Sequence, residues 1–283
     1  ISNIKRVKNF INYVKPDIIF HLAAQPIVSL SYINDIDTVI SNINGTVNIL
    51  NTLKNYDKKI AVIFVTTDKV YKNKLNPKKI TFFSEKDHLG GDDIYSASKA
   101  SCELIINAYN KSFFFNSKIK IATARSGNVI GGGDFSKNRI VPDIFRSQFL
   151  KKKLIIRNSN HIRPWQHVLD ALNGYVVLAE YLYKCNKIDL SWNFAPKKNT
   201  VKTVADLVYK YNTVTKHKFN FLFLDKNIIH EKPLLLLNAN KSRNHLNWKD
   251  KLSFVETIKY TSSWYDSYLN KENIKHITKN QIT

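Results

Sequence analysis

Apolar runs rich in β-branched residues alternate along this chain with segments whose apolar positions repeat at helical spacing. This alternation is typical of βαβ units that build a parallel sheet. It predicts strands at Ile18–Leu22, Ile60–Thr66, Ile119–Ala124 and near Leu154–Ile156. Helices are predicted at Asp35–Lys54, Ile94–Phe115, Pro142–Lys152 and Val168–Lys184. We therefore expect an α/β fold in which helices cover a parallel sheet.

Beyond Trp192 the predicted elements become shorter and their order changes. They are a helix at Thr203–Thr213, strands at Phe219–Leu224 and Leu234–Asn238, and a closing helix at Phe254–Leu269. This pattern predicts a smaller α+β lobe. We place the division near residue 165, so that residues 1–165 form the sheet domain and residues 166–283 form mainly the lobe, interleaved with the first.

Composition excludes several classes of protein. The longest apolar runs, such as the six residues Ile60–Val65, are far shorter than the roughly 20 residues that a membrane span needs. The two cysteines, Cys102 and Cys185, form neither a metal-binding spacing nor a disulfide framework. We expect a cytoplasmic protein with no metal site and no membrane partner.

The formal net charge of +22 is compatible with nucleic-acid binding, because clustered Lys and Arg attract phosphate. The lysines, however, are scattered through nearly every segment and do not gather in one stripe. This distribution favours a generally basic, solvated surface over a nucleic-acid site.

Tyr95 and Lys99 lie four residues apart in the predicted helix that starts near Ile94. This spacing places both side chains on one helix face. An ammonium beside a phenol lowers the phenol's pKa from about 10 and makes it a usable general base. The alternative is a tyrosine and a lysine that merely share an exposed surface.

Thr66, Thr67, Asp68 and Lys69 stand where the Ile60 strand is predicted to stop. Ligands of an open parallel sheet bind beyond the carboxyl ends of its strands. A hydroxyl there can bond a substrate hydroxyl, while Asp68 and Lys69 offer an acid and a base at adjacent positions. The alternative is that Asp68 only caps the following turn.

Five motifs occur in an order that resembles the extended short-chain dehydrogenase/reductase superfamily. They are "HLAAQP", "TTDKVY", "YSASKASCEL", "ARSGNVIGGGDF" and "IRPWQHVLDALNGY". Within it, the glycine-rich motif and "RPWQHV" are most similar to the 4,6-dehydratases that act on CDP-glucose. The resemblance implies a Rossmann-like, doubly wound sheet, the cofactor NAD, and a homodimer that pairs the Tyr95 helix and the helix before Ile60 with those of a second copy.

The resemblance also implies the catalytic roles. Tyr95 takes the proton from the sugar C4 hydroxyl while hydride passes to NAD, Lys99 binds the nicotinamide ribose and polarises Tyr95, and Thr67 bridges Tyr95 and the same hydroxyl. Water then leaves across C5 and C6, and the hydride returns to C6.

The pair that follows Thr67 departs from the relatives' pattern. The related dTDP-glucose 4,6-dehydratases have Asp-Glu there, whereas this chain has Asp68 and Lys69. Asp68 keeps the role of the acid at the C6 hydroxyl. Lys69 can be the C5 base only if it is neutral, which requires burial or neighbouring positive charge. Otherwise Lys69 binds phosphate or positions Asp68.

Three residues are expected on the nucleotide-sugar side: Asn128, Arg157 and Arg163. The planar guanidinium of Arg163 suits a bidentate grip on a diphosphate, and Arg157 on the preceding strand is a second candidate. A structural ion pair is the alternative for either arginine. Asn128 opens a loop whose glycines, Gly131–Gly133, allow the backbone to approach the diphosphate, or simply allow a sharp turn.

On the cofactor side, the resemblance places Ala23, Ala24 and Gln25 along the NAD ribose and adenosine, together with Tyr95 and Lys99. Small alanines equally suit tight packing of a helix on a strand. The superfamily's glycine-rich turn does not occur in this chain. Roughly 70 residues, two βα units, are expected to precede Ile1, and we expect the chain alone to bind NAD poorly.

Two other functions remain open at this stage. An epimerase or decarboxylase of the same superfamily uses Tyr95 and Lys99 but needs no acid at C6. An inactive, truncated remnant needs neither the Tyr95–Lys99 pair nor an acid at C6.

Overall fold

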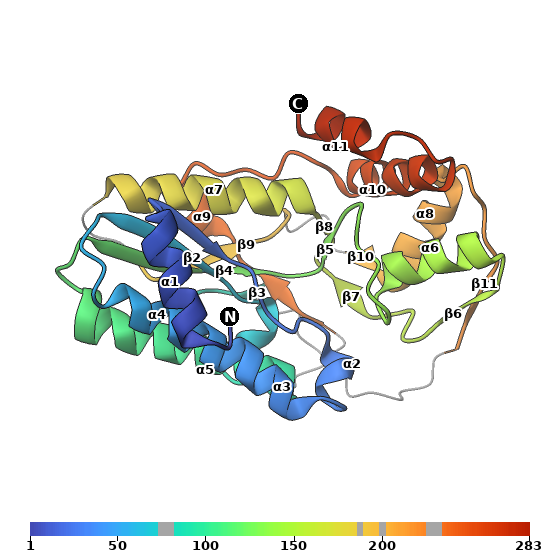
Figure 1. The fold of residues 1–283 in the computed structure, drawn as a ribbon. Coiled ribbons are helices and arrows are strands. Elements are labelled where there is room, and N and C mark those ends of the chain that lie inside the picture. The colour runs from blue at the N-terminus through green and yellow to red at the C-terminus, as the bar shows by residue number, and fades with distance from the viewer. Residues whose placement is uncertain (73–81, 186–188, 198–201, 225–233) are drawn as a thin grey trace. The chain divides into compact units, whose positions relative to one another are not determined.

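The computed structural model describes residues 1–72, 82–185, 189–197, 202–224 and 234–283 (Figure 1). The described chain divides into two compact units, which we treat separately. The first consists of residues 1–126, 174–194 and 237–248, and the second of residues 127–173, 195–236 and 249–283. The predicted boundary between residues 165 and 166 thus falls within the second unit. That this unit binds the nucleotide sugar stays a prediction.

The first unit is built on a four-stranded parallel sheet in the order β1-β2-β4-β9. Its strands are β1 (Ile18–His21), β2 (Ile60–Val65), β4 (Ile119–Ser126) and β9 (Ser191–Phe194). β2 pairs with β1 on one side and β4 on the other, with Ala61 opposite both Ile18 and Lys120. A strand covered on both faces has no polar side to show, which is why Ile60–Val65 is a continuous apolar run.

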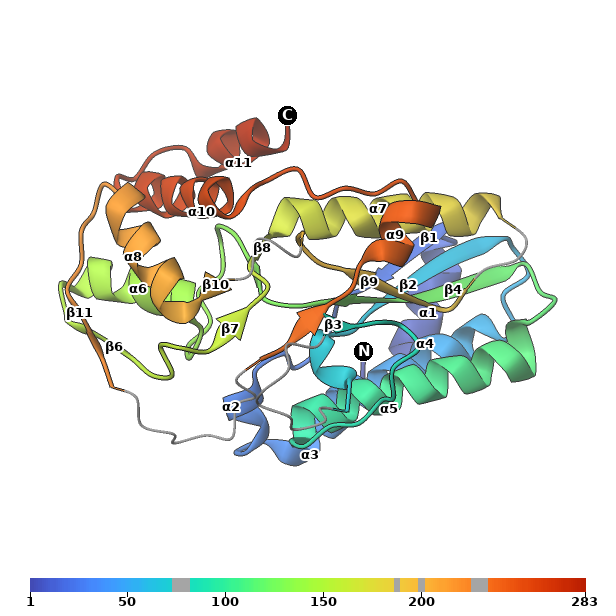
Figure 2. The same cartoon turned by 180° about the vertical axis from the view of Figure 1, so that it is seen from behind.

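Helices cover both faces of this sheet (Figures 1 and 2). α3 (Asp35–Val39), α4 (Gly45–Leu53) and α5 (Ile94–Tyr109) lie on one face, and α7 (Val168–Lys184) lies on the other from Gly174 onward. The α/β, Rossmann-like fold expected from the sequence is confirmed.

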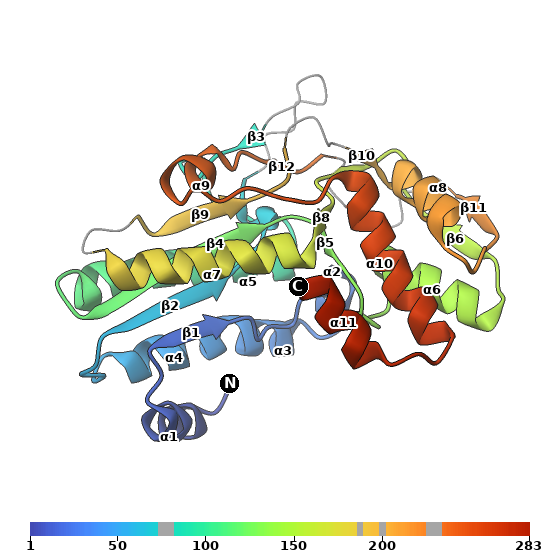
Figure 3. The ribbon, with the colours of Figure 1, turned by 90° about the horizontal axis from the view of Figure 1, so that it is seen from above.

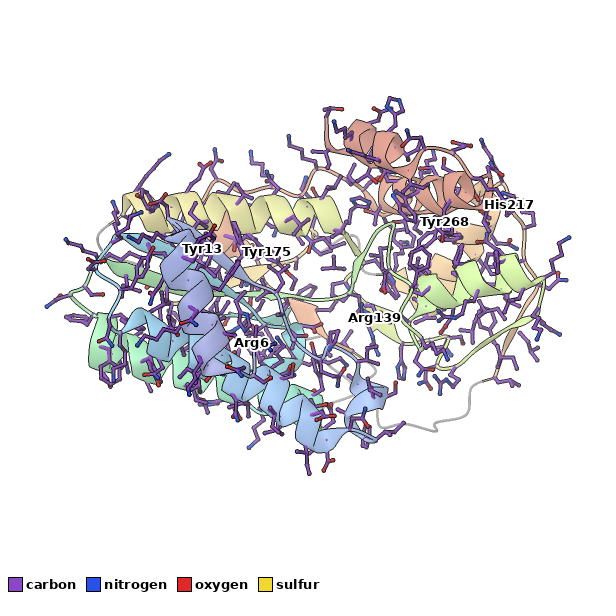
Figure 4. The ribbon with its side chains drawn as sticks, in the orientation of Figure 1. Arg6, Tyr13, Arg139, Tyr175, His217 and Tyr268 are labelled. Atoms are coloured by element: carbon purple, nitrogen blue, oxygen red, sulfur yellow. The ribbon has the colours of Figure 1, made fainter. Side chains whose placement is uncertain are left out.

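The hydrophobic core between the sheet and α4 and α5 comes from alternate positions of each strand. It includes Ile60, Val62 and Phe64 of β2 together with Leu50 and Ile106 of the helices. On the opposite face, α7 packs so closely on β9 that a Cβ on Gly174 would lie 2.4 Å from the Phe194 ring. Tyr175, labelled in Figure 4, reaches the end of β4, where its hydroxyl lies 2.8 Å from Ser126 Oγ.

Two helices predicted as regular contain π-helical turns. η1 (Ile40–Asn44) joins α3 to α4, and η3 (Asn110–Phe114) follows α5. π turns inside helices are frequent at functional sites. η1 contains the buried residue Asn42.

Shorter elements complete the first unit. They are α1 (Ile4–Val14), which packs against α4, α2 (Val28–Ser31), the 3₁₀ turn η2 (Asp68–Val70), β3 (Phe82–Phe83) and α9 (Asn240–His245). α9 lies beside β9, as the view in Figure 3 shows.

The second unit contains short strands and four helices among the residues described. The helices are α6 (Ile140–Leu150), α8 (Val204–Val214), α10 (Phe254–Leu269) and α11 (Ile274–Ile282). The strands pair as β5 (Val129–Ile130) with β8 (Gln166–His167), β6 (Leu154–Ile156) with β11 (Phe221–Phe223), and β7 (Ile162–Arg163) with β10 (Lys202–Thr203). Both α8 and α10 begin with a capping box, at Thr203 and Ser253.

Three sequence predictions need correction. Leu154–Ile156 forms a strand, but it pairs with β11 in the second unit and is not part of the main sheet. The fourth main strand is β9, which the apolar pattern missed because it is short and carries the buried polar residue Asn193. The strand expected at Leu234–Asn238 is reduced to β12 (Leu236–Leu237).

Candidate active site

Candidate site residues lie at the carboxyl ends of three neighbouring strands in the first unit. Leu22–Gln25 follows β1, Thr66–Tyr71 follows β2, and β4 ends at Ser126. Since parallel strands end at the same edge of their sheet, these segments share the edge where ligands of such folds bind.

The segment Thr66–Tyr71, which we call the 66–71 turn, carries the predicted acid. Thr67 caps the short helix η2 by accepting a hydrogen bond from the Lys69 amide at 3.4 Å, and its hydroxyl donates to Asp68 Oδ1 at 3.0 Å. The capping residue is therefore Thr67, and Asp68 does not act as the cap. Thr67 and Asp68 are both buried. The geometry provides a hydroxyl bonded to a carboxyl group.

Tyr95 and Lys99 lie on the buried face of α5, which packs against η2. α5 starts where Asp93 accepts a hydrogen bond from the Ser96 amide at 2.8 Å, so Tyr95 sits in its first turn. The alternative of an exposed surface pair is wrong, because both side chains are buried. The helix brings them to the same part of the unit as Asp68.

Lys99 is tied to the sheet as well as to its helix. Its ammonium donates a hydrogen bond to the carbonyl oxygen of Val65, at 3.1 Å. Burial lowers the pKa of Lys99 below its ordinary value, and the nearby Cys102 and Glu103 oppose that shift. The lysine thus stands next to the last residue of β2, immediately before the 66–71 turn.

Lys69 is partly exposed in this turn. A lysine that serves as a neutral base needs burial or neighbouring positive charge, and complete burial is not present. The two roles considered for Lys69, as a base or as a binding and positioning residue, both stay open.

The predicted cofactor segment leaves its backbone accessible. Ala23 is exposed and Ala24 is partly exposed, so the alternative that both pack tightly between helix and strand is not supported. The Gln25 side chain accepts from the Ile27 amide at 2.6 Å and donates to Thr38 Oγ1 at 2.8 Å. Gln25 therefore fixes the shape of this loop.

Asn42 is a residue that the sequence reasoning missed. Its side chain accepts from the Gln25 amide at 2.8 Å and donates to Ser98 Oγ at 2.9 Å. It thereby links the loop after β1 to α5 beside Lys99. The available signal was its polarity within the predicted helix Asp35–Lys54; in the structure Asn42 lies in η1 and is buried.

A second missed group is the ion pair of Glu103 and Arg125, buried in the first unit. Glu103 continues the series Tyr95, Lys99 at intervals of four residues on α5. The spacing alone was a signal, since an acidic residue at a buried position of a helix requires a partner.

The nucleotide-sugar residues lie in the second unit. The Asn128 carbonyl accepts from the Gln166 amide at 3.1 Å, which places the asparagine beside the "PWQH" segment. Arg163 is buried on β7, where Nη1 donates to the Ile162 carbonyl at 2.9 Å and Nη2 lies 3.2 Å from His161 Nδ1. Lys202 of β10 stands directly opposite Arg163 in an antiparallel pair.

The expectation that Arg157 lies on a strand is wrong. β6 ends at Ile156, so Arg157 follows the strand and does not lie on it, and its side chain is exposed. The arrangement brings Asn128 and Arg163 into one unit, and it presents Arg157 from the end of another strand of that unit.

Packing explains part of the glycine-rich loop. A Cβ on Gly132 would lie 2.1 Å from Cγ of Trp264, and one on Gly131 would lie 2.5 Å from Val168 Cγ1. Gly133 has a φ of +85°, which favours glycine. These contacts account for the three glycines without a ligand.

Two buried histidines, His21 and His167, are packing residues. His21 is buried edge-on against Phe64, and His167 against Tyr260, and burial lowers the pKa of each to about 4. Within the described ranges, His, Cys, Asp and Glu side chains form no group of three that could bind a metal ion. Among the described residues, no helix is both long enough and apolar enough to span a bilayer.

Comparison with protein families gives a match over nearly the whole chain. Residues 1–261 match the family described as GDP-mannose 4,6 dehydratase. A CDP-glucose 4,6-dehydratase of Salmonella typhimurium is 37% identical over 289 aligned residues, which cover 100% of this chain and 80% of that protein.

Solved structures share the fold at lower identity. The UDP-glucose 4-epimerase of Thermotoga maritima superposes with a TM-score of 0.82 at 19% identity, covering 95% of this chain and 83% of that one. A dTDP-glucose 4,6-dehydratase of Bacillus anthracis in complex with NAD gives 0.77 at 23% identity, covering 98% and 80%.

Proposed function

Because the chain belongs to the GDP-mannose 4,6-dehydratase family, we propose that it is a nucleotide-sugar 4,6-dehydratase, a lyase, which converts CDP-glucose to CDP-4-keto-6-deoxyglucose. The observation that carries this proposal is the 66–71 turn, where a buried Asp68 bonded to Thr67 packs next to the helix of Tyr95 and Lys99. An acid beside a proton-transfer pair is what a dehydratase requires and a 4-epimerase does not.

Tyr95 is the group that removes the proton of the sugar C4 hydroxyl. An ammonium one helical turn away favours the phenolate, and Lys99 supplies it from the same face of α5. Thr67 offers a hydroxyl to the same substrate oxygen.

Elimination of water needs a proton at the C6 oxygen and a base at C5. Asp68 in its protonated form delivers the proton to the leaving hydroxyl and is left as the carboxylate, while the base takes the proton of C5. Lys69 is next to it and partly exposed, so it can face a bound substrate. It serves either as the C5 base or as a cation that positions the substrate.

The residues of the first unit fit NAD as the cofactor. The exposed Ala23 and the partly exposed Ala24 allow a ligand to approach the backbone after β1, and Gln25 and Asn42 keep that loop in one shape. Lys99 of α5, which bonds Val65 at the end of β2, is proposed to bond a ribose hydroxyl. When bound, NAD would supply the hydride acceptor for oxidation at C4 and the hydride donor for reduction at C6.

In the second unit, Arg163 and Lys202 are the proposed diphosphate ligands. Lys202 stands directly opposite Arg163 in an antiparallel pair, and side chains of such a pair point to the same face, where both can contact one anion. Asn128 and the exposed Arg157 are proposed as further contacts to the nucleotide sugar.

We also propose a homodimer. Ile36, Val39, Ile40, Leu104 and Phe113 are exposed apolar side chains of the α3–η1 and α5–η3 segments. Exposed apolar residues that gather on neighbouring helices mark interaction sites. Mass determination in solution tests this. A cytoplasmic location stays a prediction.

The test of the function is incubation of the full-length protein and NAD with CDP-glucose. A 4-keto-6-deoxy product is detected by its ultraviolet absorbance in alkali. Tyr95→Phe and Asp68→Asn are expected to abolish this signal, whereas Tyr56→Phe, whose hydroxyl bonds the Pro16 carbonyl, leaves it unchanged. A 4-epimer in place of the keto sugar would assign the chain to the epimerases, and no turnover of CDP-glucose by the wild type would refute the substrate.

A further inference from the structure

Glu103 and Arg125 form an ion pair with exposed fractions of only 2% each. The guanidinium is bidentate, with Nε donating to Oε1 and Nη2 donating to Oε2 of Glu103, each at 2.8 Å. The paired hydrogen bonds raise the pKa of Arg125 although burial opposes this. The guanidinium therefore stays charged inside the first unit.

The same two side chains hold both ends of the 66–71 turn. At its start, the Thr66 hydroxyl donates to Glu103 Oε1 at 2.6 Å. At its end, the Tyr71 hydroxyl accepts from Arg125 Nη1 at 2.8 Å. Asp68 and Lys69 lie between these two attachment points.

Tyr71 is itself fixed from three sides. Its hydroxyl donates to Asn193 Oδ1 at 2.7 Å, and its ring stacks on Phe83 with centroids 5.1 Å apart. Burial raises the pKa of Tyr71 well above its ordinary value, so that it remains a donor. The end of the turn thus has one preferred position.

The hydrogen bonds within the turn are longer than those that hold it. The bonds from the amides of Lys69, Val70 and Tyr71 back to Thr67 and Asp68 all measure 3.4 Å. The Gly90 amide adds one short external bond, to the Val70 carbonyl at 2.8 Å. Since long hydrogen bonds are weak, the external contacts determine the shape of the turn.

Glu103 also belongs to the helix that carries Tyr95 and Lys99. The three residues follow one another at four-residue intervals on α5, where each is buried. A buried ion pair contributes little net stability compared with apolar residues of similar volume. Its presence here is better explained by the geometry that it imposes.

We propose that Glu103, Arg125 and Tyr71 are positioning residues that fix the 66–71 turn against α5, so that Thr67 and Asp68 reach the same substrate as Tyr95 and Lys99. This inference rests on the proposed dehydratase function for its consequence on rate. None of the three residues is assigned a contact with substrate or cofactor.

The experiment compares four variants with the wild type: Glu103→Gln, Tyr71→Phe, the double variant Glu103→Gln with Arg125→Met, and Ile106→Val. The last is a control at a buried apolar position on α5. For each we measure the melting temperature together with kcat and KM for CDP-glucose. Displacement of a catalytic group lowers kcat by about 10- to 100-fold, and we expect this for Glu103→Gln and Tyr71→Phe, with KM little changed.

The double variant separates positioning from stability. Glu103→Gln leaves the Arg125 charge buried without its partner, so its melting temperature falls, and removing that charge in the double variant raises it again. We expect kcat to stay low in the double variant. Recovery of kcat together with the melting temperature, or an equal loss of kcat in Ile106→Val, would overturn the proposal.

A measurement without substrate keeps this test separate from the proposed function. Hydrogen exchange at the Lys69 and Val70 amides is expected to accelerate in Tyr71→Phe and not in Ile106→Val. Unchanged exchange in Tyr71→Phe would refute positioning of the turn even if the wild type converts CDP-glucose. Faster exchange with no conversion by the wild type would refute only the proposed function.

Discussion

The ammonium of Lys99 donates a hydrogen bond to the carbonyl oxygen of Val65 at 3.1 Å, although burial lowers the pKa of this lysine. The protein therefore keeps a cation at a position where desolvation disfavours it. Such a placement is expected of a residue that is retained for its function.

Replacing Lys99 with Met should stabilise the protein while abolishing turnover. A lysine with a lowered pKa in the folded state binds protons more readily when unfolded, so the wild type gains stability as the pH rises from the folded pKa to 10.5. Lys99→Met removes this dependence and should add about 1 kcal/mol at neutral pH. Thermal unfolding between pH 7 and 10 measures it. The exposed Lys86→Met is the control, and an equal gain there would contradict the explanation.

His21 should make the protein sensitive to acid. Its pKa is lowered from 6.5 to about 4, first by burial and then by the charge of Lys99. Protonation of His21 thus favours the unfolded state. The contribution of this residue to stability is fully present above pH 6.5. As the pH falls from 6.5 towards 4, the free energy of unfolding decreases by up to about 1.4 kcal/mol per pH unit for this one group.

His21→Leu should therefore flatten the curve of unfolding free energy against pH in that interval. Urea unfolding at several pH values measures this slope. The matched variant His276→Gln, at an exposed histidine, should leave it as in the wild type. A His21→Leu protein with the wild-type slope would show that other groups cause the acid sensitivity.

Gly132→Ala should destabilise the protein, because the added Cβ would lie 2.1 Å from Cγ of Trp264 in the core of the second unit. Overpacking of this kind costs typically about 1–3 kcal/mol. Lys137→Ala, an exposed change close by in the chain, should have no such effect on the melting temperature. A stable Gly132→Ala protein with weakened CDP-glucose binding would instead favour the ligand role of this loop.

Arg163→Lys should weaken CDP-glucose binding more than Arg157→Lys does. Lysine keeps the charge but loses the planar fork, and hydrogen bonds to a charged group contribute about 1.5–3 kcal/mol each. Calorimetric titration should show the dissociation constant rise by about 10- to 100-fold for the buried Arg163. An Arg157 variant that loses more affinity would exchange the two roles.

Deuterium exchange at the sugar C5 should distinguish the roles of Asp68 and Lys69. Asp68→Asn removes the acid at the C6 oxygen and is expected to slow product formation by about 10²- to 10⁴-fold, while C5 exchange with solvent continues. Lys69→Met should stop that exchange if Lys69 is the base. Exchange that persists in Lys69→Met would leave it the binding or positioning role.

The apolar patterns of the sequence predicted the strands and helices that are buried on one face or on all sides. The continuous apolar run of β2 and the helical spacing of α5 and α7 led to the right elements within a few residues, and the motif residues at strand ends fell where a parallel sheet gathers its ligands. The local sequence was sufficient for these elements, because each segment carries its own pattern of apolar residues.

Contacts between distant segments could not be predicted in the same way. Nothing in "LII" at Leu154–Ile156 indicates that its partner is β11 and not the main sheet. Likewise, Arg125 lies within a motif expected to face the substrate, and only the fold shows that its guanidinium pairs with Glu103. Such pairings depend on tertiary packing, which a single sequence does not display.

The polar contacts around Arg125 join segments that are synthesised far apart. Ser191 Oγ accepts from Arg125 across 66 residues, and Asn193 accepts from Tyr71 across 122. During synthesis, the strand that contributes both partners emerges only after the whole segment 127–173. Assembly of the 66–71 turn must therefore wait for a late, non-local step of folding, which is the kind of step that slows the kinetics of a domain.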